Sequence, residues 1–256
     1  MSSLVAAPLK DPGLDSKEAR QRKKYMVELF GYQARNYDLH DDLIGLGVHR
    51  RWVLDMVRVI KGFMQGRASA RMLDLACGTG FVAFNVARQF ASIDIDGFDI
   101  SREMVAIARE RHQKVFRGRK INFWVGDAEV AYGENGYDII TTCFAFRNFA
   151  NKNLATENVF RALKPGGVFI IQDLTKPEHQ PLKGLYLFSM KYILPIIARI
   201  LGTEKRAPRY LYNSVQLMPK NAEIKRLLES SCFTGVSCKS QTLGIACLIV
   251  GYKPEG

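Results

Sequence analysis

The sequence predicts an α/β fold: a seven-stranded, mostly parallel sheet with an antiparallel C-terminal strand pair, N-terminal helices and an inserted helical lid. Two observations predict it. From about residue 70, short apolar runs alternate with longer segments of helical periodicity, which is typical of the crossover units of a parallel sheet. Near the C-terminus, two apolar runs follow each other across a short turn, a spacing that joins antiparallel neighbours.

Two helices are expected before the sheet. Residues 1–16 look like a loose tail and are predicted to be flexible. Residues 17–33 fit a basic, then amphipathic helix, and residues 48–65 fit a second helix. The apolar residues of the second helix recur at helical spacing: Trp52, Val53, Met56, Val57 and Ile60. We assign residues 17–66 to the N-terminal helices of a single domain that spans residues 17–256.

Residues 67–173 carry the alternating pattern. Five strands are expected, at "RMLDLA", "IDIDGFDI", "KINFWVGD", "GYDIITTCF" and "GGVFIIQDL". Helices are expected at Phe81–Phe90, Arg102–Lys114 and Leu154–Leu163. In "LKPGG", Leu163–Gly167, the proline and the glycines end the last helix and turn the chain into the fifth strand.

The alternation then breaks. Residues 174–218 are predicted to be an insertion with an aromatic and aliphatic helix near 184–200, a lid over an apolar channel. Residues 219–256 are predicted to hold a short helix at 221–230 and two strands, "FTGVSCKSQ" and "GIACLIVGYK", around Thr242–Gly244. These two strands would close the edge of the sheet as an antiparallel pair.

A glycine loop follows the first strand. In "LDLACGTGFVA", Gly78, Gly80 and Ala83 stand between a strand and a helix and satisfy the dinucleotide fingerprint. Asp99 lies 19 residues beyond Gly80, at the end of the second strand, where a carboxylate binds a ribose diol. Residues 67–173 are therefore predicted to bind an adenosine-containing cofactor. The glycine pattern alone does not separate NAD from other cofactors of this kind.

Two further carboxylates favour S-adenosylmethionine. Asp74 lies inside the first strand, four residues before Gly78. A carboxylate there would repel a pyrophosphate, whereas it would help to hold the α-amino group of S-adenosylmethionine, which has no phosphate. Asp127, in "GDA" (Gly126–Ala128), ends the third strand at a place where an adenine amino group can be recognised.

Longer stretches carry a resemblance over roughly residues 25–252. They are "YDLHDDLIGLGVHRRW" (Tyr37–Trp52), "LDLACGTG", "FRNFANK" (Phe146–Lys152), "VFRALKPGG" and "RYLYNSVQLMP" (Arg209–Pro219). With them the chain resembles the class I S-adenosylmethionine-dependent methyltransferases, which have a Rossmann-like fold. More narrowly, it resembles the family that C-methylates quinone precursors in ubiquinone and menaquinone biosynthesis.

The chain departs from the family pattern in three places. His40-Asp41 replaces the usual Met-Asn, Gln172–Thr175 replaces Leu-Glu-Phe-Ser, and Pro208 stands where an aromatic residue is common. These segments are expected to face the substrate. The resemblance therefore implies an acceptor of the demethylmenaquinol or polyprenyl methoxy-benzoquinol type without choosing between the two or fixing the tail length.

The resemblance also implies the site residues. The cofactor would be contacted by the loop from Gly78 to Gly80 with Thr79, by Asp99, by Asp127 and Ala128, and near Cys143, in addition to Asp74. The catalytic residues would be Tyr37, Arg147 and Asn148. No metal is expected.

Methylation of a ring carbon needs a place for a phenolate, because deprotonation of a hydroxyl makes the ring nucleophilic. The transfer itself is mainly a positioning task. Arg147 would stabilise the phenolate and Asn148 would orient its oxygen. Tyr37 would order the methyl group or stack on the ring, while His49 and Asp173 are candidate bases. We expect Asp173 to be the partner of Arg147 in the empty enzyme.

The net charge and the cysteine content limit which partners and which cellular compartment are expected. The net charge of +12 and the pI near 9.5 indicate either an anionic partner, such as a membrane surface facing "RQRKK" (Arg20–Lys24), or simple solubility. The five cysteines contain no C-x-x-C pair, which favours a reducing compartment. The most apolar segment, Leu185–Leu201, is short and charged for a membrane span. We expect a cytoplasmic protein, peripheral to the inner face of the membrane, and the resemblance suggests a homodimer.

Other functions stay open at this point. One is a methyltransferase for another small phenolic or sterol acceptor, and one of another class is a non-catalytic cofactor-binding or scaffold protein. A NAD-dependent dehydrogenase is disfavoured by Asp74. Nucleic acid is not an expected partner, because "CFAFRN" replaces the Asn/Asp-Pro-Pro-aromatic motif of adenine methylation and no RNA-binding module is recognisable.

Overall fold

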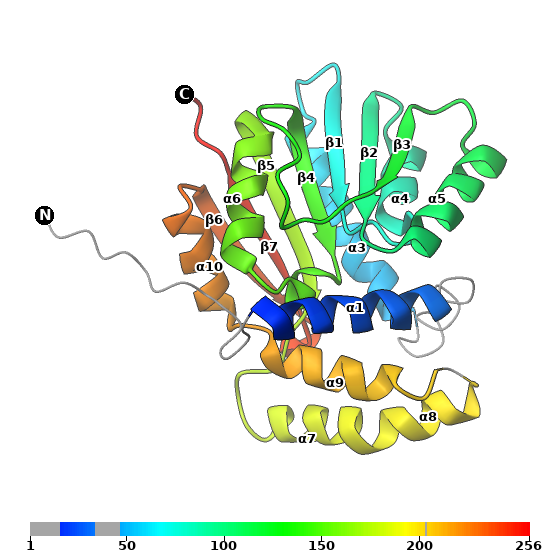
Figure 1. Ribbon diagram of the computed structural model, residues 1–256. Coiled ribbons are helices and arrows are strands. Elements are labelled where there is room, and N and C mark those ends of the chain that lie inside the picture. The colour runs from blue at the N-terminus through cyan, green and yellow to red at the C-terminus, as the bar shows by residue number, and fades with distance from the viewer. Residues whose placement is uncertain (1–15, 34–46, 203) are drawn as a thin grey trace, which may run out of the picture.

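The fold is a seven-stranded sheet between two layers of helices (Figure 1). The computed structural model describes residues 16–33, 47–202 and 204–256. Along the sheet the strand order is β3-β2-β1-β4-β5-β7-β6. The strands are β1 (Ala70–Leu75), β2 (Ile93–Asp99), β3 (Ile121–Val125), β4 (Tyr137–Cys143), β5 (Leu163–Leu174), β6 (Thr234–Gln241) and β7 (Ala246–Tyr252).

The strand directions follow the sequence prediction. Strands β1 to β5 pair in parallel, whereas β7 runs antiparallel to both β5 and β6. The predicted class, a mostly parallel sheet with an antiparallel C-terminal pair, is confirmed. Parallel strands place their carboxyl ends at one edge, so the loops after β1 to β5 meet there.

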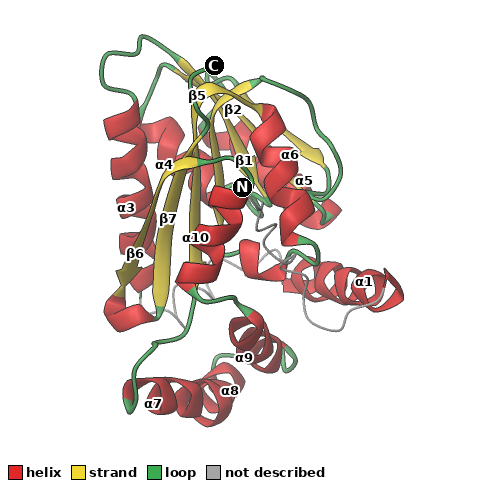
Figure 2. Ribbon diagram, turned by 90° about the vertical axis from the view of Figure 1, so that its left-hand side faces the viewer, coloured by secondary structure: helices red, strands yellow, loops and turns green. Residues whose placement is uncertain are grey.

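Helices cover both faces of the sheet. The described helices are α1 (Ser16–Gln33), α3 (Val48–Phe63), α4 (Phe81–Gln89), α5 (Arg102–Val115), α6 (Lys152–Ala162), α7 (Leu182–Phe188), α8 (Leu194–Ile200), α9 (Ala207–Leu217) and α10 (Asn221–Ser230), of which α1 and α7 to α9 lie at one edge of the sheet (Figure 1). One apolar core lies between the sheet and α3, α4 and α5, and a second lies between the sheet and α6 and α10. Figure 2 shows α3 and α10 on opposite sides of β6 and β7.

The strands alternate between these two cores. Ile139 and Ile170 belong to the first core, whereas their neighbours Ile140 and Ile171 belong to the second. Successive strand residues point to opposite faces, so a strand buried on both faces must be apolar at almost every position. This explains why the central strands appear in the sequence as continuous apolar runs.

Several boundaries differ from the prediction by one or a few residues, and two of these differences have a clear local cause. Helix α6 begins at Lys152 rather than Leu154, because the Asn151 side chain caps it by accepting a hydrogen bond from the Leu154 amide at 3.1 Å. Strand β5 begins at Leu163, inside the segment predicted to be a turn, and pairs with Tyr137 there. The register then shifts across the "KPGG" residues, so the turn chemistry produces an irregularity within the strand.

The insertion contains more helix than predicted. Residues 182–200 form one rod, in which the π-helical segment η2 (Ser189–Ile193) joins α7 to α8. Helix α9 was not predicted. Its Pro208 stands in the first turn, where a proline needs no amide partner and does not break a helix. Helix α9 lies between the sheet edge and the α7–α8 rod (Figures 1 and 2).

A substitution of Gly167 tests how tightly the backbone packs at the register shift in β5. A Cβ there would lie 2.8 Å from the Lys164 carbonyl oxygen and 3.1 Å from that of Asp138. Because backbone atoms cannot move aside cheaply, Gly167→Ala should lower the free energy of unfolding by about 2 kcal/mol in urea denaturation. Gly62→Ala in α3 is the matched control: nothing lies within 4 Å of its Cβ, so it should be neutral or stabilising by up to about 1 kcal/mol. Equal effects of the two variants would refute the packing argument.

Candidate active site

A cavity of about 490 Å³ lies at the carboxyl edge of the sheet. Helix α1 crosses this edge (Figure 1) and contributes Lys23, Met26, Val27 and Phe30 to the lining. The expected cofactor residues that line the cavity are Asp74, Gly78, Thr79, Asp99, Asp127, Ala128 and Cys143. Among the described residues, none from α7, α8 or α9 lines it. In the described part of the chain, α1 therefore lines the cavity directly, whereas the insertion contacts the lining through Tyr210 of α9, which bonds Asn148.

The glycine loop is shaped by two left-handed residues and one carboxylate. Gly78 and Gly80 have φ angles of 54° and 85°, a region that favours glycine. The Gly78 amide donates to Asp99 Oδ2 at 2.9 Å, and the Ser101 amide donates to Asp99 Oδ1 at 2.9 Å. Gly80 does not line the cavity. A Cβ on it would meet the Phe84 ring at 2.6 Å, so Gly80 serves the packing of α4.

Asp74 is a buried acid on the cavity wall. Its carboxylate accepts hydrogen bonds from Thr141 Oγ1 at 2.9 Å and from the Ala83 amide at 3.2 Å. Burial raises the pKa of Asp74 to about 7, and the nearby charge of Asp99 adds to this, although both hydrogen bonds oppose it. Among the described residues, no Lys, Arg or His side chain forms an ion pair or hydrogen bond with this carboxylate.

Lys23 ties α1 across the cavity to the loop after β3. Its Nζ lies 2.8 Å from Asp127 Oδ2 and 2.9 Å from Glu129 Oε2. Burial lowers the pKa of Lys23, but the hydrogen bonds and charges of the two acids outweigh this and raise it. The sequence marked Lys23 only as part of a basic run, because its partners are more than 100 residues away.

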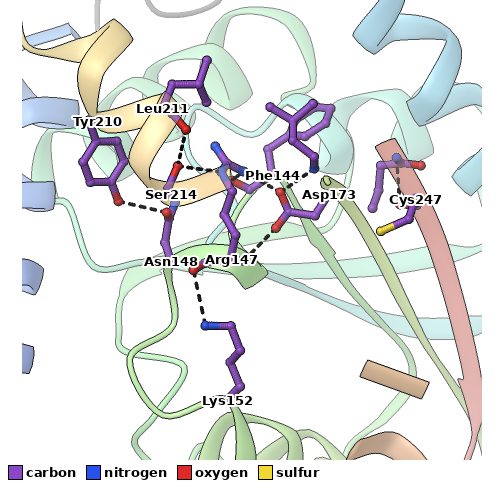
Figure 3. Close-up of polar contacts among 11 residues, drawn as sticks. Phe144, Arg147, Asn148, Lys152, Asp173, Tyr210, Leu211, Ser214 and Cys247 are labelled. Atoms are coloured by element: carbon purple, nitrogen blue, oxygen red, sulfur yellow. Dashed lines mark hydrogen bonds and ion pairs between the residues drawn. The ribbon is translucent and has the colours of Figure 1, made fainter. Parts of the chain in front are cut away.

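Arg147 forms a buried ion pair with Asp173 (Figure 3), as the sequence predicted. The two side chains are 4% and 0% exposed, and Arg147 Nη1 lies 2.5 Å from Asp173 Oδ1. The Arg147 amide also donates to Asp173 Oδ2 at 2.8 Å, and the guanidinium donates to the Phe144 carbonyl and to Ser214 Oγ. Arg147 does not line the cavity.

Asn148 is the polar residue of the "FRNF" turn, η1 (Phe146–Asn148), that reaches the cavity. The hydroxyl of Tyr210 on α9 donates to Asn148 Oδ1 at 2.9 Å (Figure 3). This leaves the amide nitrogen of Asn148 as a donor for a ligand. Sequence reasoning missed Tyr210 and Ser214 because it missed α9, and the "RYLYNSV" stretch was the signal that would have found them.

Lys152 supports the same turn from beneath. Its Nζ donates to the carbonyl oxygen of Phe149 at 2.8 Å and to that of Arg147 at 3.3 Å, and the residue is only 2% exposed. Lys152 thereby satisfies two buried backbone carbonyls of the turn. The turn is thus held by Asp173 on one side and by Lys152 on the other.

The remaining predicted residues divide between the cavity and other places. His49 lines the cavity, with its ring centroid 5.6 Å from that of Phe81. Asp173 does not line it, and both of its oxygens accept hydrogen bonds, so its geometry offers no support for a role as the base. Tyr37 and His40 lie outside the described residues. Within the described ranges, no group of His, Cys, Asp or Glu side chains is arranged to hold a metal ion.

The fold and the cavity together define an α/β enzyme of the S-adenosylmethionine-dependent methyltransferase class. Two solved structures share the fold. One is a phosphoethanolamine N-methyltransferase of Haemonchus contortus, with a TM-score of 0.59, 17% identity, and coverage of 77% of this chain and 52% of that chain. The other is a methyltransferase of Aquifex aeolicus, with a TM-score of 0.57, 16% identity, and coverage of 87% and 97%.

The chain belongs to the ubiE/COQ5 methyltransferase family, whose model matches residues 16–253. It is 31% identical over 241 residues to the ubiquinone/menaquinone biosynthesis C-methyltransferase UbiE of Haemophilus ducreyi, covering 92% of this chain and 90% of the relative. It is 30% identical over 234 residues to the demethylmenaquinone methyltransferase of Porphyromonas gingivalis, covering 90% and 94%. The resemblance inferred from the sequence motifs is confirmed, and the chain is a methyltransferase.

The buried ion pair predicts a large effect on stability. Asp173→Ala leaves the Arg147 guanidinium buried without its counter-charge, so we expect the free energy of unfolding to fall by about 3 kcal/mol or more in urea denaturation. Adding Arg147→Met to this variant removes the buried charge and should recover at least about 1 kcal/mol. Additive losses from the two substitutions would show that the pair is not coupled.

Proposed function

We propose that this chain uses S-adenosyl-L-methionine to methylate a ring carbon of a quinol in menaquinone or ubiquinone biosynthesis. The observation that carries the proposal is a single cavity. It joins the glycine loop and the acids at the ends of β2 and β3 to aromatic side chains and an amide from the "FRNF" turn. A donor and an acceptor bound there would share one space, and holding the two together is the main requirement of an in-line methyl transfer.

The donor side of the cavity fits S-adenosylmethionine. Asp99 suits the ribose diol, Asp127 the adenine amino group and Asp74 the α-ammonium group. A Cβ at Gly78 would stand in open space, so the glycine leaves room for a ligand against the backbone. Thr79, Ala128 and Cys143 line the same side. When bound, this cofactor supplies an electrophilic methyl group on a sulfonium.

The acceptor side suits a flat aromatic ring with oxygen substituents. Phe144 and Phe149 line the cavity beside Asn148 and provide apolar walls for the ring. The Asn148 amide would donate to a ring oxygen and stabilise the charge that grows there on deprotonation. His49 is our candidate for accepting the hydroxyl proton, because it lines the same cavity.

The other two predicted catalytic residues take different places in the proposal. Because Asp173 neutralises Arg147 away from the cavity, we assign Arg147 to holding the turn that presents Asn148. Tyr37, which lies outside the described residues, keeps the role that the resemblance implies, ordering the methyl group or the ring. Since a polyprenyl quinol resides in a bilayer, the proposal includes a peripheral contact with the membrane.

The test of the function is a transfer assay with a methyl-labelled donor. We expect label on a ring carbon of demethylmenaquinol or of a demethyl polyprenyl methoxy-benzoquinol, and none on bulk RNA. Asn148→Ala should lower kcat by about a hundredfold while the affinity for S-adenosylhomocysteine stays unchanged. Label on an oxygen atom, or turnover only with simple phenols or sterols, would contradict the proposal.

Asp74 predicts a pH dependence of cofactor binding. Its raised pKa of about 7 means that the folded protein holds a proton here which the unfolded chain would lose near pH 4, so this group contributes less stability as pH rises toward 7. A bound ammonium group favours the carboxylate and expels this proton. Binding of S-adenosylhomocysteine should therefore tighten about tenfold from pH 6 to pH 8.

Calorimetry in buffers of different ionisation enthalpy measures the released proton directly. The Asp74→Asn variant is the control, because burial also raises the pKa of Asp99, which remains in that variant. We expect the variant to bind more weakly and with little dependence on pH. The assignment of Asp74 to the ammonium group fails if the wild type shows the same affinity at both pH values.

A further inference from the structure

The α7–α8 rod presents an apolar face to solvent. Its exposed apolar residues recur every three or four positions: Leu185, Phe188, Tyr192, Ile196 and Ile200, with Ile193 and Ile197 beside them. Leu185 is 65% exposed and Ile200 is 78% exposed. On the other side of the rod, Met190 and Ala198 are buried where the rod meets α9. A contiguous apolar row of this length marks a binding surface.

Positive charges accompany this face. Lys183, Lys191 and Arg199 lie along the rod, and residues 179–203 contain no Asp or Glu. Lys205 and Arg209 follow directly and are exposed. In the described part of the chain, every helix is too short or too polar to cross a bilayer. Apolar residues flanked by Lys and Arg on a short helix suit the plane of a membrane interface.

The rings on the face have the amphipathic character of interfacial residues. Phe188 and Tyr192 lie with their ring centroids 4.9 Å apart, and Lys191 Nζ lies 5.3 Å from the centroid of the Tyr192 ring. Tyrosine places an apolar ring in the acyl region and its hydroxyl among the head groups, while a lysine stem extends its charge outward. Both side chains therefore suit the interface of a bilayer with an apolar acyl region and anionic head groups.

We propose that α7, η2 and α8 form the surface by which this protein lies on an anionic lipid bilayer. The inference rests on the proposed function, since a prenylated quinol must leave the bilayer to reach the cavity. The rod is the outermost element at the sheet edge that carries the cavity (Figures 1 and 2), so docking turns this edge toward the lipid. The basic run of α1 is less suited, because its Lys23 is bound to Asp127 and Glu129.

The charges favour lipid over a second copy of the chain as the occupant. A two-fold interface places the same patch on both partners. Pairing this face with itself would bring the positively charged Lys183, Lys191 and Arg199 of both copies together, and residues 179–203 contain no acid that could neutralise them. Anionic head groups supply that neutralisation.

The experiment measures binding to phosphatidylcholine vesicles with and without about one third phosphatidylglycerol, by flotation. The wild type should bind the anionic vesicles. Phe188→Ser with Ile196→Ser removes apolar contact without changing the charge, and should weaken binding at least about tenfold. Leu54→Ser on α3 is the matched control, an exposed apolar residue elsewhere, and should change binding less than about twofold.

Two further measurements separate this inference from the proposed function. Turnover of a short-chain, water-soluble quinol should be the same for the double variant and the wild type, whereas turnover of a long-chain quinol in vesicles should fall about tenfold. Sedimentation velocity tests the second copy as occupant. The inference is overturned if the double variant and Leu54→Ser bind vesicles equally, or if the double variant converts a dimer to a monomer without loss of vesicle binding. If the wild type does not methylate the short-chain quinol at all, the proposed function is refuted instead.

Discussion

The structure depends most on the neutralisation of one buried guanidinium. Arg147 lies in the turn that follows β4, and Asp173 lies near the end of the neighbouring strand β5. Removing both from water is costly unless they are paired and hydrogen-bonded. Their contacts also reach the Phe144 carbonyl and Ser214 of α9. One ion pair therefore joins the sheet, the "FRNF" turn and the insertion, and it fixes the backbone that carries Asn148 to the cavity.

The cavity is divided by chemistry into two sides. On the proposed donor side, carboxylates from β1 and from the ends of β2 and β3 line the cavity and suit the amino and hydroxyl groups of the cofactor, and burial raises the pKa of Asp74. On the proposed acceptor side, aromatic rings and the amide of Asn148, which Tyr210 orients, line the cavity and suit a ring with oxygen substituents. Helix α1 closes both sides, because Lys23 ties it to Asp127 and Glu129.

The insertion connects the "FRNF" turn to the exposed α7–α8 rod. Helix α9 contacts Asn148 through Tyr210 and Arg147 through Ser214, while its other side supports the α7–α8 rod. The rod exposes its apolar residues instead of folding them over the site. The segment predicted to be a lid thus exposes an apolar face on the α7–α8 rod, while the neighbouring helix α9 bonds polar groups of the "FRNF" turn.

The sequence by itself determined the succession of strands and helices along the chain. Apolar runs and helical spacing are local, so they predicted the sheet and most helices. The glycine loop predicted where a cofactor would bind, and the "YDLHDDLIGLGVHRRW" and "FRNF" stretches predicted the family. What only the tertiary structure decided are contacts between distant residues: Lys23 with Asp127, Tyr210 with Asn148, and the direction in which the rod faces. An amphipathic or apolar helix has the same sequence pattern whether it covers a cavity or faces lipid. In the same way, the sequence does not show whether Arg147 contacts a substrate or a carboxylate. Packing decides between these, because it fixes which partner lies within hydrogen-bonding distance.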